Sequence, residues 1–100
     1  MKLNFHSDPG HGWLQVPLSE IQRLGIGKQI SHYSYMSARG PNPLVYLEED
    51  CDASIFIEAA KSKGEQIEFN DVSYNDECFI RGLPNFTPTN VGRMLLGVDN

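Results

Sequence analysis

The sequence contains few cysteines and lacks any long hydrophobic run. Neither Cys51 nor Cys78 has a second cysteine or histidine at metal-ligand spacing, so we predict two reduced thiols and no zinc site. No apolar segment approaches the roughly 18 to 20 residues that span a bilayer. Residues 1–12 also lack the apolar core of a secretory signal. These absences predict a cytoplasmic protein that makes no membrane contact.

Sequence signatures of catalysis are missing as well. The chain has no GxSxG, HExxH, Walker or GxGxxG pattern, and GIGKQIS at residues 25–31 lacks the spacing of a phosphate loop. We therefore predict no cofactor, no bound metal and no catalytic residue. An enzyme is the less favoured class on this evidence.

Positive charge is scarce, and its scarcity is local. Eight lysines and arginines stand against thirteen aspartates and glutamates, which gives a formal net charge of −5. Residues 48–77 hold ten of the acids and only two lysines, a net charge of −8, whereas the rest of the chain carries +3. An acidic stretch of this kind repels phosphates, so we expect no direct nucleic-acid binding.

What is present is the composition of one folded domain. The 100 residues are 40% hydrophobic and 10% aromatic, without repeats or low-complexity linkers. We predict a single α+β domain over residues 1–100, in which residues 84–100 form a loosely ordered tail. The mean size of single domains allows one modest core and no second one.

Hydrophobic periodicity predicts the order β-β-α-β-β-α-β-β. Two stretches repeat apolar residues at helical spacing, one over residues 17–24 and one over residues 53–60. Alternating stretches predict strands, which are residues 2–6, 13–16, 31–38, 44–48, 66–69 and 77–81. The connections are short, so hairpins dominate, and we expect a mainly antiparallel sheet with two helices packed on one face.

The stretch YLEEDCDA at residues 46–53 is the densest group of acids. Asp50 or Asp52 stands where the second helix needs an N-cap, which explains part of the charge as structure. The spacing of an EF-hand calcium loop is absent, because Ser54 and Ile55 follow the last aspartate. A solvated acidic face remains an alternative, but we predict a partner-binding surface formed by Glu48, Glu49, Asp50 and Asp52.

Two further segments are candidate sites. In SDPGHGW at residues 7–13, flanking glycines give His11 backbone freedom, and His6 and Asp8 are near enough to orient it, which predicts ligand binding. The alternative is an ordinary turn with a surface histidine. Tyr33 and Tyr35 are candidate partner anchors on one strand face, although a role in the core is favoured for them.

Three blocks, GHGWLQVP, LGIGKQISHYSYMS and VYLEEDCDASIFIEAA, resemble a family of small uncharacterised proteins carried by bacteriophages and plasmids. The likeness covers residues 3–69, and the stretch after Phe69 departs from the pattern, which leaves the role of the C-terminal third open. The family has no established activity, so the resemblance implies no catalytic residue. It implies a mobile-element gene and a bacterial host cytoplasm.

Three hypotheses of function follow from these observations. The favoured one is a protein-interaction module that binds a host or phage protein and inhibits a nucleic-acid-handling or defence enzyme through its acidic surface. The second is a metal-assisted enzyme or small-ligand protein that uses His6, Asp8, His11 and the acidic cluster. The third is a minor virion or assembly component. The sequence does not indicate an oligomeric state.

Overall fold

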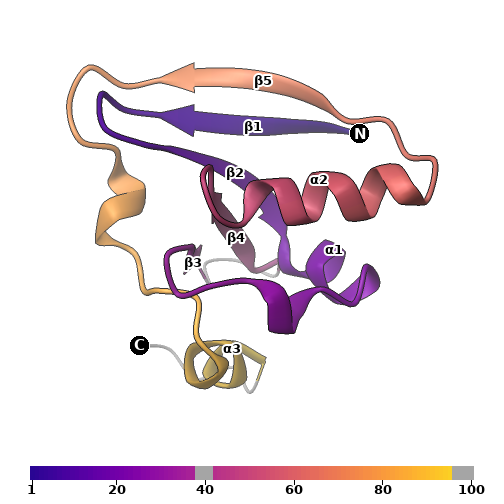
Figure 1. Cartoon of the computed structure of the whole chain (residues 1–100). Coiled ribbons are helices and arrows are strands. Elements are labelled where there is room, and N and C mark those ends of the chain that lie inside the picture. The colour runs from indigo at the N-terminus through magenta and orange to yellow at the C-terminus, as the bar shows by residue number, and fades with distance from the viewer. Residues whose placement is uncertain (38–41, 96–100) are drawn as a thin grey trace.

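The protein forms one five-stranded sheet in a computed structural model that describes residues 1–37 and 42–95, with side chains through residue 92 (Figure 1). The strand order across the sheet is β3-β4-β2-β1-β5. The strands are β1 (Lys2–Ser7), β2 (Gly12–Pro17), β3 (Tyr35–Ser37), β4 (Leu44–Glu48) and β5 (Glu68–Ser73). The predicted α+β class with a mainly antiparallel sheet is therefore confirmed.

Antiparallel pairing joins the four strands from β3 to β1. Trp13 on β2 lies opposite Glu48 on β4 and opposite His6 on β1, so the centre of the sheet combines the first and second hairpins. The last strand differs, because β5 runs parallel to β1 with Glu68 beside Lys2. This parallel pair makes the sheet mixed, a feature that the hairpin argument did not predict.

Helices connect and cover these strands. They are α1 (Leu18–Arg23), α2 (Ala53–Ser62) and α3 (Pro88–Leu95), with short 3₁₀ segments η1 (Gly27–Gln29) and η2 (Phe79–Gly82). The predicted pattern in α2 is confirmed, since Ala53, Phe56 and Ala60 are buried. Gly64, at φ 77°, follows α2 in the left-handed conformation that ends many helices. No helix in the described part is long and apolar enough to cross a membrane.

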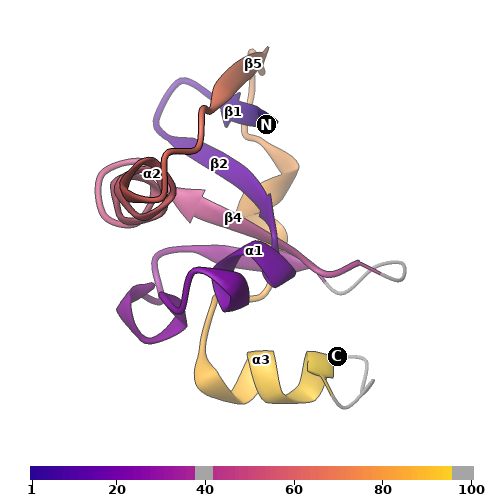
Figure 2. The same cartoon turned by 90° about the vertical axis from the view of Figure 1, so that its right-hand side faces the viewer.

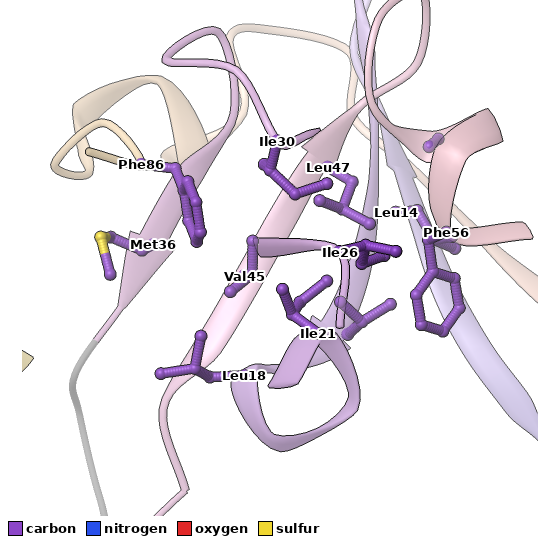
Figure 3. Packing of buried hydrophobic residues seen from close by; sticks show 12 residues of the cluster. Leu14, Leu18, Ile21, Ile26, Ile30, Met36, Val45, Leu47, Phe56 and Phe86 are labelled. Atoms are coloured by element: carbon purple, nitrogen blue, oxygen red, sulfur yellow. The ribbon is translucent and has the colours of Figure 1, made fainter. Parts of the chain in front are cut away.

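The two faces of the sheet bury different side chains, because successive strand residues point to opposite sides. One face packs aliphatic residues against α1 and α2 (Figure 3), and its buried cluster includes Leu14, Val16, Ile21, Val45, Leu47 and Phe56. The other face buries Trp13 and Tyr46 beneath Cys78 and Ile80 of the chain that follows β5. We call these the helical face and the aromatic face (Figure 2).

Several predicted elements are wrong in detail. Residues 77–81 form no strand, because residues 79–81 belong to the 3₁₀ helix η2. The strand predicted at 66–69 begins at Glu68 and continues to Ser73. Of the strand predicted at 31–38, only Tyr35–Ser37 is regular, and residue 38 lies outside the described residues.

The start of the predicted tail contacts the core. Phe86 is buried in the helical-face core, and its backbone N–H donates to the Ser34 carbonyl over 2.7 Å. Residues 88–95 then form α3, a third helix that the sequence argument did not assign. Residues 96–100 of the predicted tail lie outside the described part of the chain.

Candidate ligand-binding pocket

A hollow of about 300 Å³ opens on the aromatic face, where β2 and β4 meet the loop between β1 and β2. Four separate segments of the chain supply its walls, and together they mix aromatic rings with charged groups. The lining residues, which we call the aromatic–acidic pocket, are His11, Trp13, Tyr33, Tyr35, Glu48, Asp50, Cys51 and Arg81. Most predicted site residues therefore lie on or beside one surface.

The loop that carries His11 is shaped by close contacts. Asp8 Oδ1 accepts hydrogen bonds of 3.0 Å from the backbone N–H groups of Gly10 and His11, which closes the turn. A Cβ atom at Gly10 would lie 2.8 Å from Arg81 Nη2, and one at Gly12 would lie 2.5 Å from the Phe5 ring. Neither glycine has a positive φ. A side chain at either glycine would displace Arg81 or Phe5, so both glycines also leave space for these side chains.

Asp8 is a structural partner of Arg81. The guanidinium donates to both carboxylate oxygens, with Nε–Oδ2 at 2.6 Å and Nη2–Oδ1 at 2.9 Å, and the Cys78 N–H donates to Oδ2 over 3.0 Å. These bonds hold the pKa of Asp8 far below its usual range, and Asp8 in turn raises the pKa of Arg81. The Asp8 side chain is only 1% exposed, so it positions Arg81 and does not reach a ligand in the pocket.

Arg81 completes one wall because it is held over an indole ring. Its Cζ lies 5.3 Å from the ring centroid of Trp13, within the range of a cation–π contact. The Tyr35 ring meets the same indole edge-on at 6.3 Å. The buried indole Nε1–H of Trp13 has no hydrogen-bond acceptor among the described residues. The wall thus combines the rings of Trp13 and Tyr35 with one positive charge, on Arg81, that is already paired with Asp8.

Glu48 explains why an acid ends a buried strand. Its Oε2 accepts from the backbone N–H groups of Asp50, at 3.0 Å, and Cys51, at 2.8 Å, and so closes the turn between β4 and α2. Its Oε1 lies 3.9 Å from His11 Nδ1. One oxygen of Glu48 therefore maintains the turn while the other faces the pocket.

The acids at the end of β4 converge with the loop histidine. Ligand atoms of His11, Glu48, Glu49 and Asp50 all lie within 4.8 Å of one another. Oxygen and imidazole groups at this spacing are the kind that would hold a divalent cation. The linear spacing that argued against a calcium loop did not indicate this group, because His11 joins it through the β2–β4 pairing.

Cys51 borders the pocket but is a weak nucleophile. Its pKa is raised, first by hydrogen bonding to the Glu48 carboxylate and then by burial and the nearby charges of Asp52 and Asp50. The thiol therefore stays protonated at neutral pH. The prediction that the cysteines are free thiols agrees with the structure, where Cys51 is exposed and Cys78 is buried.

Asp52 does not belong to the partner surface that the sequence predicted. It is 1% exposed, and its Oδ2 accepts from Ser31 N, Ser31 Oγ and Ser34 Oγ at 3.0, 2.7 and 2.6 Å. Asp52 occupies the N-cap position of α2, yet its side chain makes no capping hydrogen bond. The carboxylate instead fastens the segment before β3 to the start of α2, and a partner cannot reach it.

His6 also lies apart from the pocket. It is buried, with Nε2 at 2.7 Å from Gln15 Oε1 and Nδ1 at 3.0 Å from the Tyr74 hydroxyl. Burial raises the pKa of that Tyr74 hydroxyl, which favours its neutral form. The predicted grouping of His6, Asp8 and His11 around one ligand is therefore not formed, since only His11 lines the pocket.

The two tyrosines have different environments. Tyr33 is 58% exposed and its ring lies tilted against that of His32, with centroids 4.4 Å apart, whereas Tyr35 is half-buried against Trp13. Both line the pocket. The sequence argument assigned no site role to Trp13 or Arg81. One signal was present, because Arg81 is the only basic residue between Lys63 and Arg93.

Comparisons of the chain with protein-family models, with curated proteins and with solved structures find no match in any of the three searches.

Proposed function

We propose that this chain is a protein-interaction module whose aromatic–acidic pocket binds an arginine or lysine side chain of a partner protein. The observation that carries the proposal is the combination of three aromatic residues, Trp13, Tyr33 and Tyr35, with the carboxylates of Glu48 and Asp50 in one hollow. Aromatic faces and carboxylates both attract cations, and a long basic side chain also buries its aliphatic stem.

The charge balance of the pocket favours a cation. Arg81 is paired with Asp8, so its charge is already matched. Within the described residues, neither Glu49 nor Asp50 has a lysine or arginine within ion-pair distance, and both are exposed. An incoming guanidinium or ammonium would therefore meet uncompensated negative charge beside the aromatic wall.

The size of the hollow supports a side chain as its ligand. A volume of about 300 Å³ lies at the lower limit of cofactor and drug-sized pockets, which span roughly 300 to 1,000 Å³. Contact of a cation with an aromatic face contributes about 0.5 to 2 kcal/mol, depending on how much water is removed. One such contact is modest, which suits a specificity contact inside a larger protein interface.

The finer proposal is that the partner is a host or phage protein with a basic surface. The net charge of −8 over residues 48–77 supports it, because acidic arrays accelerate association with basic surfaces and compete with phosphates for them. Nucleic-acid-handling and defence enzymes carry such surfaces, and inhibition of one of them in a bacterial cytoplasm is the form of the proposal that we favour. An enzyme built from His6, Asp8 and His11 receives no support from the separation of these residues.

The pocket can be tested with small probes before a partner is known. Titration of ¹⁵N-labelled protein with N-acetyl-arginine methylamide or its lysine analogue is expected to shift the signals of His11, Asp50 and the Trp13 indole. The glutamine analogue, which has no charge, is expected to leave them unchanged. Equal shifts with all three compounds would contradict the proposal.

Matched variants then separate the charge of the pocket from charge elsewhere. Asp50→Asn and Tyr33→Leu are each expected to lower the affinity for the arginine probe by about threefold or more, which corresponds to the loss of one cation contact. Glu58→Gln removes one exposed charge from α2 and is expected to leave affinity unchanged. The same variants can then be used to capture the partner protein from bacterial lysate. The expected partner binds Glu58→Gln but neither Asp50→Asn nor Tyr33→Leu.

A further inference from the structure

The two edges of the sheet are treated differently by the chain. At one edge β3 is covered, because Met36 N donates to Pro84 O over 2.9 Å, Phe86 N donates to Ser34 O, and Tyr35 forms a bridge with Asn85. At the other edge β5 pairs with β1 on one side only, and Figures 1 and 2 show no element beyond it. An open edge presents a row of unpaired backbone groups.

The register shows which groups face outward. Glu68 N donates to Met1 O and Tyr74 N donates to Ser7 O, both over 2.8 Å. The backbone N–H and C=O groups of the even-numbered residues of β5 therefore face β1. The N–H and C=O groups of Phe69, Asp71 and Ser73 therefore point away from the sheet. None of them has a backbone partner in the part of the chain that the structure describes.

A second hollow, of about 310 Å³, lies beside this edge between β1, β5 and α2. Its lining is apolar except for one carboxylate, and it consists of Phe5, Leu14, Ala53, Ile57, Phe69 and Asp71. Phe69 is 47% exposed there, so part of its ring is available to a partner side chain. A strand added along β5 would direct every second side chain toward this hollow.

Charge selects the kind of strand that fits. Residues 68–73 contain two acids, Glu68 and Asp71, and no base. Two copies paired through β5 would bring four carboxylates onto one ladder without a base, and like charges across strands are destabilising. A strand that carries lysine or arginine meets these acids with the opposite charge.

We propose that the free edge of β5 accepts an extended segment of a partner protein, with a basic residue beside Asp71 and an apolar side chain over the hollow lined by Phe5 and Ile57. Backbone hydrogen bonds to Phe69, Asp71 and Ser73 provide affinity, and alternate side chains provide specificity, as in other cases of strand addition. This surface is separate from the aromatic–acidic pocket and does not depend on its function.

A peptide whose second, fourth, sixth and eighth residues alternate valine with lysine, TVTKTVTK, is the probe for this surface, because it places both kinds of side chain on the face that holds Asp71 and the hollow. Its binding is expected to slow amide hydrogen exchange at Phe69, Asp71 and Ser73, with little change at Asn70 and Val72, whose N–H groups already face β1. The charge-reversed peptide TVTETVTE is expected to give no protection. Uniform protection, equal binding of both peptides, or signals shifted at Trp13 in place of β5 would overturn the proposal.

Two variants with matched controls test the backbone and charge contributions. Ser73→Pro removes an outward N–H and leaves the hydrogen bonds to β1 intact. It is expected to lower the affinity for the lysine peptide by about fivefold, whereas Ser73→Ala is expected to leave this affinity unchanged. Asp71→Asn retains the N–H and is expected to reduce the preference for lysine over glutamine in the peptide. If Ser73→Pro binds as well as Ser73→Ala, or if exchange at Phe69 slows with protein concentration alone, a partner strand is excluded.

Discussion

The helical face and the aromatic face are made by alternate residues of the same strands, yet they are held by different forces. Leu14 and Leu47 point to the helical face and join an aliphatic cluster around Phe56. Their neighbours Trp13 and Glu48 point the other way, into directional contacts. Burial is tolerant of small geometric changes, whereas hydrogen bonds and ion pairs are not.

This division shows how a small chain combines stability with an accessible site. The aliphatic cluster supplies the non-directional burial that a domain of this size needs. The aromatic face depends more on polar contacts: Arg81 is bonded to Asp8, and Glu48 closes the turn that follows β4. It can therefore leave a hollow open to solvent without loss of the fold.

The largest predicted effect compares one substitution on the two faces. Phe56→Ala on the helical face is expected to lower the free energy of unfolding by about 3 to 5 kcal/mol, because it leaves a cavity in a fully buried cluster. Phe79→Ala on the aromatic face removes a ring that is 52% exposed and is expected to lower it by less than about 1.5 kcal/mol. Urea unfolding of both variants measures the difference, and equal losses would remove the distinction between the faces.

A smaller effect is expected where polar groups are buried next to the pocket. Ser34 Oγ donates to Asp52 and accepts from Glu48 N over 2.9 Å, so Ser34→Ala strips one hydrogen bond from each and is expected to lower the free energy of unfolding by about 1 to 3 kcal/mol. Ser62→Ala, at an exposed helix position, is expected to change it by about 0.5 kcal/mol or less. Thermal unfolding of the two variants side by side provides the measurement.

The third effect depends on pH and belongs to the aromatic face. Because the pKa of Asp8 in the folded protein lies below its ordinary value of 3.8, the carboxylate stabilises the fold above pH 3.8, and this contribution is lost as the pH falls further. Asp8→Asn is therefore expected to lower stability at neutral pH and to make unfolding less sensitive to acid. Denaturant midpoints at pH 7 and at about pH 2.5 would show it.

Glu58→Gln is the control for that experiment, since Glu58 lies exposed on α2. It is expected to retain the acid sensitivity of the unchanged protein. The stability of Asp8→Asn is still expected to fall somewhat in acid because of Glu65, whose pKa is lowered by the ion pair with Arg23. If Asp8→Asn loses as much stability in acid as the unchanged protein, the Asp8–Arg81 pair does not stabilise the aromatic face.

The smallest effect concerns thiol reactivity at the edge of the pocket. Because Glu48 raises the pKa of Cys51, alkylation at neutral pH is expected to be slower than that of an unstructured cysteine peptide. Glu48→Gln is expected to accelerate it several-fold. Iodoacetamide rates followed by mass spectrometry report this, with buried Cys78 as the unreactive internal reference. A rate in Glu48→Gln that equals the starting rate would contradict this effect.

Local patterns predicted those elements whose stability is local. The helix from Ala53 to Ser62 and the strand Leu44–Glu48 follow from side-chain periodicity, and the structure confirms both. The expected strand at 77–81 failed because Cys78 and Ile80 are both buried, two residues apart, which imitates a strand. The Cys78 N–H is bonded to Asp8 instead of to a neighbouring strand.

The pocket was predicted only in parts, because its geometry depends on long-range pairing. The sequence indicated the acids and His11 separately, but only the pairing of β2 with β4 brings them together. Asp52 was assigned to the surface because its charge is visible in the sequence, whereas the two serines that bury it are distant in the chain. Arg81 was missed because its partner stands 73 positions earlier.

That separation has a consequence for the order in which the chain folds. The loop around Asp8 leaves the ribosome before its hydrogen-bond donors at Cys78 and Arg81, which emerge only after α2 and β5. Closing so large a loop is entropically slow. The residues around Phe56 on the helical face can therefore begin to pack before the wall formed by Arg81 and Trp13 assembles.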